Sequence, residues 1–270
     1  MDLGLKGRSC VVTGASRGIG RETTRLLCAE GADVLLVGRN EERLVAAQEE
    51  ASAAGAEADG RAEALLLDVT AEDAGERMLA AASERFGALD VLVNNAGAAR
   101  WRDLDDVPDA DWYAQYELNV MAPLRAMRAA APPMAERGWG RVVNVCSTAG
   151  KRPSAAMPEY SVAKAAELSL SRLFADRYAK SGVLVNAICP GPVEAELWME
   201  PGGLLDQSHE MSGAASREEA LATAGAKRPI GRLAEVGEIA SAIVFLCSER
   251  ASYVSGAAWS VDGGTVQVII

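Results

Sequence analysis

The 270-residue sequence predicts an α/β fold, in which a doubly wound parallel sheet of about seven strands is covered by helices on both faces. Short apolar runs alternate with helix-like segments along the chain. The runs are apolar throughout, as expected for strands that are buried on both faces. No Ser/Gly-rich or Pro/Gly-rich linker divides the chain, so a single domain with right-handed crossovers is predicted over residues 1–270.

The first predicted strand, residues 9–13, ends in a glycine-rich turn that leads into a helix over about residues 19–30. Further helices over 41–54 and 71–86 are rich in alanine, a strong helix former whose small side chain packs closely on a sheet. The remaining predicted strands are bounded by turn residues or helix-like segments and cover residues 33–37, 63–67, 91–94, 141–145, 183–188 and 257–261.

One segment, about residues 192–228, interrupts this alternation. It has a polar middle, a PGG sequence at 201–203 and the single histidine, His209. Because connections of this length in compact domains are usually either functional lids or disordered, we expect a substrate lid here. With no second histidine, no metal site is expected.

The composition narrows the class of protein. Hydrophobic residues make up 49% of the chain, enough for a sizeable core. The 38 acidic and 27 basic residues give a net charge of -11, which argues against a nucleic-acid-binding surface or a polybasic membrane anchor. No apolar run approaches the about 20 residues of a membrane span, and MDLGLKGRS lacks the apolar stretch of a signal peptide. A cytoplasmic location is therefore expected.

The cysteines are scattered, odd in number and without CxxC spacing. Neither a disulfide framework nor a zinc site is predicted, and buried structural thiols are expected. They are Cys10, Cys146 and Cys189 in predicted strands, and Cys28 and Cys247 in predicted helices.

The turn TGASRGIG, residues 13–20, predicts a phosphate site. Gly14, Gly18 and Gly20 allow a tight turn, a close approach to a pyrophosphate and close packing of the helix on the strand. The following helix presents free amides and its positive dipole end to the phosphates. Such a turn alone could be merely a tight turn, but its place at the first βα junction favours a dinucleotide. Without a following Gly-Lys-Ser/Thr, a P-loop is not expected.

The end of the second predicted strand bears on the choice of cofactor. An acid there suits the ribose of NAD, whereas an arginine suits a 2′-phosphate. This chain has Gly38 and Arg39, and Arg17 in the turn adds a second guanidinium, so NADP(H) is predicted in preference to NAD(H). The alternative is that both arginines are surface charges. Asp68, with Val69 beside it, is expected near the adenine.

Tyr160 and Lys164 lie four residues apart in PEYSVAKAA, residues 158–166, which brings both onto one face of a predicted helix. A free phenol titrates at about 10, so it is a poor base at neutral pH. A cation one turn away, together with a positive nicotinamide, favours the phenolate and is expected to bring its pKa closer to neutral pH. Alone, the two residues could be an ordinary surface pair.

Seven motifs in order give the sequence a family resemblance. The chain resembles the short-chain dehydrogenase/reductase family over nearly its whole length, and in particular the compact branch that includes 3-oxoacyl-carrier-protein reductases. The resemblance implies a Rossmann-like fold. The motifs are TGASRGIG, NNAG at 94–97, Asn119 in ELNVMAP, Ser147 in NVCSTAG, YSVAK at 160–164, CPGPV at 189–193 and VDGGT at 261–265.

The resemblance implies a role for each catalytic residue. Tyr160 would be the general acid that protonates a ketone or 3-oxoacyl oxygen, and the base in the reverse oxidation of a secondary alcohol. Lys164 would lower the pKa of Tyr160 and bind the nicotinamide ribose, Ser147 would hold the carbonyl oxygen, and Asn119 would help order a proton-relay water. Cofactor contacts are implied for Gly14, Ser16, Arg17, Gly18, Ile19, Gly20, Arg39, Asp68, Val69, Asn95, Ala96, Gly97, Tyr160, Lys164, Pro190, Gly191 and Val193, with Ile188 and Val193 beside the nicotinamide.

The sequence departs from the family pattern at one position. Relatives often carry Thr or Ser shortly after the PG turn, where the hydroxyl meets the cofactor, but PGPVEAE places Ala195 there. Altered cofactor affinity or lid ordering is therefore expected.

The substrate pocket is expected over Ser147 and Tyr160. Its predicted walls are residues 98–102, residues 148–158 and the lid, and the apolar lid side chains favour an apolar ketone or acyl substrate, although they could simply pack. The lid side chains are Leu197, Trp198, Met199, Leu204 and Leu205.

The resemblance also implies a homo-oligomer, a tetramer. The apolar tail, residues 266–270, is compatible with burial against a neighbour or on its own subunit. An alternative function is an NADP(H)-binding redox sensor or scaffold without turnover. The intact catalytic set favours the oxidoreductase.

Overall fold

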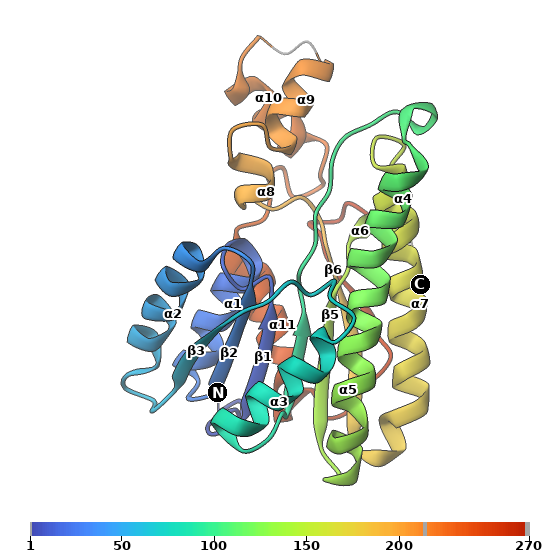
Figure 1. Ribbon diagram of the computed structural model, residues 1–270. Helices are drawn as coiled ribbons and strands as arrows, with labels where there is room; N and C mark the ends of the chain where they lie inside the picture. Colours follow the sequence, from blue (N-terminus) through green and yellow to red (C-terminus); the bar gives the residue numbers. More distant parts are fainter. Residues whose placement is uncertain (1, 213–214, 268–270) are drawn as a thin grey trace.

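The computed structural model describes residues 2–212 and 215–267. Seven strands in this part of the chain form one parallel sheet (Figure 1). The strand order is β3-β2-β1-β4-β5-β6-β7, so the chain reverses its direction of winding between β1 and β4. This confirms the predicted doubly wound fold, and each strand overlaps its predicted range. The strands are β1 (Ser9–Thr13), β2 (Asp33–Gly38), β3 (Arg61–Leu66), β4 (Val91–Asn94), β5 (Gly140–Val145), β6 (Val183–Pro190) and β7 (Ala258–Val261).

Helices cover both faces of the sheet, which explains why the strands are apolar throughout. Cys10 and Val12 of β1 pack with residues of α1, α2 and α11, whereas Val11 packs with residues of α3, α5 and α7. Successive strand residues thus face two separate cores. The main helices are α1 (Gly18–Ala29), α2 (Glu41–Gly55), α3 (Ala74–Phe86), α4 (Asp109–Tyr116), α5 (Ala122–Glu136), α7 (Pro158–Tyr178) and α11 (Val236–Cys247).

The segment 192–228 is largely helical, which the sequence analysis did not predict. Its described part forms α8 (Glu196–Met199), α9 (Leu204–Ser212) and α10 (Arg217–Ala226), which lie together at one end of the sheet (Figure 1). An ion pair of 3.0 Å between Arg217 and Asp206 joins α10 to α9. We call residues 192–228 the lid segment.

Short helical turns complete the chain between these elements. Residues 213–214 of the lid segment and 268–270 of the apolar tail lie outside the described residues. Within the described ranges, no helix combines the length and apolar character needed to cross a membrane. The short elements are η1 (Leu104–Asp106), the π-helical turn η2 (Glu117–Met121), α6 (Thr148–Lys151), η3 (Ala179–Ser181) and η4 (Glu249–Ala251).

All five cysteines are free and buried, as predicted. Cys146 follows β5 directly and is not part of it. Burial raises the pKa of the Cys247 thiol to about 12, so this thiol is neutral at ordinary pH.

Candidate active site

A cavity of about 820 Å³ lies at the carboxyl ends of the strands, where parallel α/β sheets usually bind ligands. It extends from the glycine-rich turn to the lid segment. Nearly all of the predicted site residues line it; Gly20, Asn119 and Ile188 are the exceptions. Those that line it are Gly14, Ser16, Arg17, Gly18, Ile19, Arg39, Asp68, Val69, Asn95, Ala96, Gly97, Ser147, Tyr160, Lys164, Pro190, Gly191 and Val193.

The glycine-rich turn has the backbone geometry that its sequence predicts. Gly14 and Gly18 have φ values of +64° and +53°, a region that favours glycine. Gly20 does not line the cavity. It packs closely inside the turn, since a Cβ there would come within 2.4 Å of the Asn95 side-chain nitrogen. That nitrogen donates hydrogen bonds to the carbonyls of Thr13 and Gly14 at 2.9 and 3.2 Å. Gly20 therefore serves the close packing of the turn.

The amino-terminal end of α1 fits a phosphate group. Arg17 is the N-cap residue and makes no side-chain cap, and the first turn of this fully described helix carries no acidic residue. The helix dipole favours an anion at the terminal amides, and the Glu196 carboxylate of the lid segment already lies close, 3.2 Å from where a Cβ on Gly18 would be. The residues present fit the pyrophosphate of a dinucleotide.

Two carboxylates lie beside the arginines near this end of the cavity. Arg39 is exposed and forms a 3.4 Å ion pair with Asp68. Hydrogen bonds from Thr70, and to a smaller extent the charge of Arg39, lower the pKa of Asp68. Arg17 forms a 2.7 Å ion pair with Glu200 of the lid segment. The sequence analysis did not anticipate either pairing.

A third arginine, Arg43 in the first turn of α2, also lines the cavity. Its guanidinium forms a 2.9 Å ion pair with Glu200, so this one carboxylate binds both Arg43 and Arg17. The sequence analysis missed Arg43, although it lies only four residues after Arg39, in the first turn of the helix that follows.

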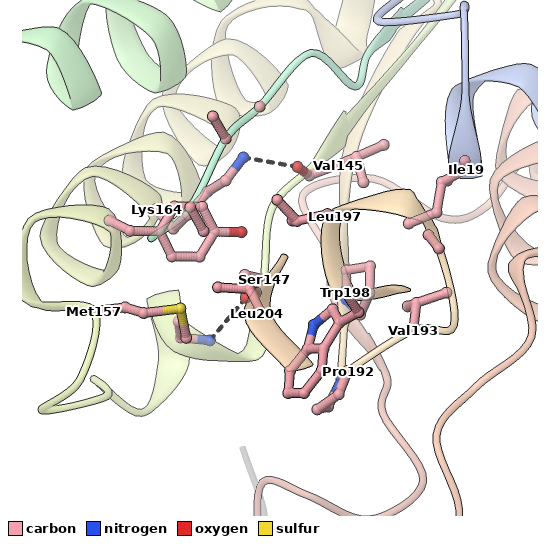
Figure 2. Close-up of a pocket in the computed structure, with 18 of the residues that line it drawn as sticks. Ile19, Val145, Ser147, Met157, Lys164, Pro192, Val193, Leu197, Trp198 and Leu204 are labelled. Carbon is pink, nitrogen blue, oxygen red and sulfur yellow. Dashed lines mark hydrogen bonds between the residues drawn. The ribbon is translucent and has the colours of Figure 1, made fainter. Parts of the chain in front are cut away.

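The active-site helix α7 places Lys164 one helical turn after Tyr160. The Lys164 Nζ lies 5.7 Å from the centroid of the Tyr160 ring. It donates hydrogen bonds to the Val145 carbonyl at 2.9 Å and to the Glu167 carboxylate at 2.8 Å. Figure 2 shows the bond to Val145 at the cavity wall. Glu167 is a buried residue that the sequence analysis missed.

Ser147 lies at the N-cap of α6 and faces the same cavity. Its Oγ accepts a 3.1 Å hydrogen bond from the Ala149 amide (Figure 2), and the hydroxyl also forms a hydrogen bond with Tyr160. The structure therefore brings Ser147, Tyr160 and Lys164 together, as predicted.

The charge of Lys164 lowers the pKa of Tyr160, as the sequence analysis expected, but it does not decide the net shift in the cofactor-free chain. Burial raises the pKa of this phenol above its ordinary value, while the charge of Lys164 and a hydrogen bond with Ser147 offset only part of the rise. Glu167 raises it further. The sequence analysis considered Lys164 but neither the burial nor the nearby carboxylate.

Asn119 is fully buried in the π-helical turn and does not line the cavity. Its side-chain nitrogen donates to the Gln115 carbonyl at 3.0 Å and the Gln115 side chain at 2.7 Å. Within the described residues, its Oδ1 has no hydrogen-bond partner. A Cβ on Gly97 would lie 3.5 Å from this oxygen and 3.9 Å from Lys164 Nζ, so both groups adjoin the same glycine. π-Helical turns often occur at functional sites.

Apolar side chains form the far wall of the cavity. Trp101 and Trp198 meet edge to face, with ring centroids 6.4 Å apart. Figure 2 shows Leu197, Trp198 and Leu204 of the lid segment near Ser147. The Trp101 amide donates a 2.8 Å hydrogen bond to Gln207 of α9, which joins the loop after β4 to the lid segment.

Several predicted wall residues lie elsewhere. Leu205 is buried away from the cavity, and Met199 lines a separate surface recess. Arg102 forms an ion pair with Asp111. Ala195 does line the cavity, and as the N-cap residue of α8 it provides no side-chain cap. Ile188 is fully buried in β6 and does not line the cavity.

Comparison with known proteins agrees with this geometry. Residues 8–202 match the family described as short chain dehydrogenase. A 3-oxoacyl-acyl-carrier-protein reductase of Vibrio cholerae is 34% identical over 266 residues, covering 98% of this chain and 100% of that protein. A cis-4-hydroxycyclohexanecarboxylate dehydrogenase of Sinomonas cyclohexanicum is 37% identical, covering 97% of each chain. The crystal structure of L-sorbose reductase from Gluconobacter frateurii, complexed with NADPH and L-sorbose, has a TM-score of 0.91 at 32% identity and full coverage of both chains.

The fold and the site define a Rossmann-like oxidoreductase. The chain belongs to the short-chain dehydrogenase family.

Proposed function

We propose that the protein is an NADP(H)-dependent oxidoreductase that interconverts a ketone or 3-oxoacyl group and a secondary alcohol. The observation that carries this proposal is the meeting of Ser147, Tyr160 and Lys164 in the cavity that the glycine-rich turn also lines. The compared relatives carry names of this reaction class, and one of the compared structures contains NADPH. A redox sensor or scaffold without turnover would have no chemical need for all three side chains in one cavity.

The chain's own residues would bind and protonate the carbonyl oxygen. When bound, the cofactor supplies the hydride. The Ser147 hydroxyl, whose oxygen already accepts from Ala149, donates to the carbonyl oxygen and fixes its position. Tyr160 donates the proton to this oxygen as its negative charge develops. Lys164 holds positive charge near the phenol, and Asn119 and Lys164 both adjoin Gly97, where a relay water would be ordered.

The raised pKa of Tyr160 predicts opposite pH dependences for the two directions. Reduction needs the protonated phenol, so kcat for reduction should stay constant through neutral pH and fall only as pH rises through this pKa. Alcohol oxidation needs the phenolate and should rise with pH, with a midpoint below that of the reduction profile because the positive charge of the oxidised nicotinamide favours the phenolate. Steady-state rates from about pH 6 to 11 in both directions, extended only as far as the protein stays folded, check this. A reduction rate that falls near neutrality would contradict it.

The arginines beside the glycine-rich turn support the proposed preference for NADP(H). Arg17 and Arg43 both contact Glu200, and a 2′-phosphate would offer these guanidiniums a second anion. Glu200 would then compete with the phosphate for the same two side chains. Arg39 remains a third candidate, although it is exposed and paired with Asp68.

Arg43→Ala is expected to weaken NADPH binding by about 10- to 100-fold and to change NADH binding little, because a charge-assisted hydrogen bond contributes about 1.5–3 kcal/mol. Arg39→Ala should weaken the preference for NADPH by a smaller factor, since Arg39 is more exposed. Dissociation constants from cofactor fluorescence titration measure both effects.

Two variants serve as controls for this prediction. Glu200→Gln should tighten NADPH binding, because it removes the competing charge. Arg77→Ala, a surface arginine on α3 paired with Asp73, should leave both constants unchanged. Equal affinities of the parent protein for NADPH and NADH would contradict the argument from the 2′-phosphate.

The apolar wall of Trp101, Trp198 and Leu204 supports an apolar ketone or acyl group as the substrate. A spectrophotometric screen of ketones, 3-oxoacyl thioesters, sugars and steroids with both reduced cofactors tests the class. No turnover with any of these carbonyl compounds would count for the sensor or scaffold.

A homo-oligomer, a tetramer, is also proposed. Val162 and Leu173 on α7 and Tyr113 on α4 are large apolar side chains that this single chain leaves exposed. Burial of such side chains is a common source of stability in subunit interfaces. Light scattering measures the assembly, and a monomer would contradict the proposal.

A further inference from the structure

Glu167 is a buried acid next to the active-site lysine, and the mechanism above does not use it. It lies three residues after Lys164 on α7, and its Oε2 accepts the 2.8 Å hydrogen bond from Lys164 Nζ. The two side chains are only 1% and 3% exposed. Glu167 does not line the cavity, so it is placed to act on Lys164 and not on a ligand.

A buried carboxylate is costly unless it is paired, so its presence needs a physical reason. One consequence of the pairing concerns position. With the Val145 carbonyl at 2.9 Å, Glu167 gives the ammonium a second fixed anchor behind the cavity wall. Without the carboxylate, Lys164 Nζ would keep only one of these two partners.

The other consequence concerns charge. The ammonium lies 5.7 Å from the centroid of the Tyr160 ring, and a full positive charge at that distance in a buried site favours the phenolate. The negative charge of Glu167, in direct contact with the ammonium, opposes this effect. The phenol therefore experiences much less than a full positive charge.

The other titratable groups around Lys164 and Glu167 do not supply a negative charge that could replace that of Glu167. Burial raises the pKa of the Cys146 thiol, and that of Cys189 to about 11, so both thiols are neutral at ordinary pH. Lys151 of α6 donates its hydrogen bonds to Ala258 and Ser260 at β7. From the π-helical turn, the side chain beside Lys164 is Asn119, which carries no charge. Burial raises the pKa of Glu167, while the charge of Lys164 and hydrogen bonds with Lys164 and Cys146 lower it. Within the described residues, Glu167 is the acid whose negative charge opposes Lys164 at Tyr160.

We propose that Glu167 is a positioning residue of this active site, which anchors the Lys164 ammonium and reduces its charge at Tyr160, so that the phenol of the cofactor-free protein stays protonated through neutral pH. The inference rests on the proposed function and deepens it. A phenol that stays protonated suits carbonyl reduction and delays alcohol oxidation to alkaline pH. In agreement, burial raises the pKa of Tyr160 and Glu167 adds to the rise, while Lys164 opposes it.

The test titrates the cofactor-free protein and so does not depend on turnover. The tyrosinate absorbance of each protein is followed against pH, and the curve of the matching Tyr160→Phe variant is subtracted to isolate Tyr160. In Glu167→Gln, which keeps an oxygen acceptor for Lys164 but removes the charge, the midpoint should fall by about one pH unit. An unchanged or higher midpoint would overturn the proposal.

A conservative variant separates charge from packing. Glu167→Asp keeps the carboxylate, so its midpoint should remain close to that of the wild type. A midpoint as low as that of the glutamine variant would show that packing, and not charge, determines the pKa of the Tyr160 phenol. This result would overturn the proposal.

The wild-type protein provides a measurement that needs no folded variant at position 167. The ring carbon next to the Tyr160 hydroxyl, followed by NMR in carbon-labelled protein, should not titrate below about pH 10. Titration near neutral pH would overturn the proposal even if every variant at 167 failed to fold.

Kinetics then connect the titration to the reaction. The midpoint of the pH profile for alcohol oxidation should move to lower pH in Glu167→Gln, in the same direction as the absorbance titration. A midpoint that stays fixed while the absorbance titration shifts would overturn the role of Glu167 in turnover. If no carbonyl substrate is found, the proposed function fails separately, because the cofactor-free titration still reports on Glu167.

Discussion

Tyr160→Phe is expected to lower kcat about 1000-fold while NADPH binds with nearly unchanged affinity. The substitution removes only the hydroxyl, and a positioned general acid contributes about 10²–10⁴ to the rate. The ring of residue 160 would still occupy the cavity wall. Steady-state reduction of a substrate identified in the screen, together with NADPH fluorescence titration, measures both quantities.

Tyr178→Phe is the matched control for this prediction. Tyr178 ends the same helix and stacks on Phe174, with ring centroids 5.9 Å apart. Loss of the Tyr178 hydroxyl should not change kcat. Near wild-type rates in Tyr160→Phe would reject the assignment of Tyr160 as the proton donor.

Lys164→Met is expected to abolish activity and also to lower the free energy of unfolding by about 3–5 kcal/mol. Removing one partner of a buried ion pair leaves the other charge buried without compensation, and here that charge is Glu167. The double variant Lys164→Met/Glu167→Leu should recover most of the lost stability, because neither charge then remains. It should not recover activity. Denaturant unfolding and steady-state rates separate the two effects.

An exposed ion pair on the same helix gives the control. Arg172 and Asp176 of α7 form a 2.8 Å pair with both side chains more than half exposed. Arg172→Met should change stability far less than Lys164→Met, because solvent screens exposed pairs. A Lys164→Met protein as stable as the wild type would contradict the ion-pair argument.

The fold could be predicted from the sequence because both faces of the sheet are covered. In β1, for example, Cys10, Val11 and Val12 are all apolar, since neighbouring residues enter opposite cores. Glycine-rich turns and short apolar runs mark such strands locally. The lid helices were missed because α9 and α10 are joined by tertiary contacts such as that between Arg217 and Asp206.

The lining of the candidate site was predicted better than its electrostatics. Ser147, Tyr160 and Lys164 meet as the motifs indicated, because each follows a strand end or lies on one helix face. The contact of Glu200 with Arg17 joins residues far apart in the sequence, and no local pattern shows it. Glu167 did leave a local signal, its spacing of three from Lys164, but only the structure shows that this helix face is buried.

The change in sign of the Tyr160 pKa shift has the same origin. From sequence, Lys164 and a bound nicotinamide were the charges expected near the phenol, and both lower its pKa. Burial of the phenol and the contribution of Glu167 both depend on the folded chain, and together they outweigh the effect of Lys164.

The central claim is that Tyr160 protonates a carbonyl that receives hydride from a nicotinamide bound in the same cavity. A single-turnover experiment tests it most directly: protein premixed with NADPH deuterated at the reactive carbon is combined with a ketone, and the product is analysed by mass spectrometry. The account predicts deuterium on the new alcohol carbon in the wild type and almost none from Tyr160→Phe over the same time. Alcohol without deuterium, or equal transfer by both proteins, would contradict it.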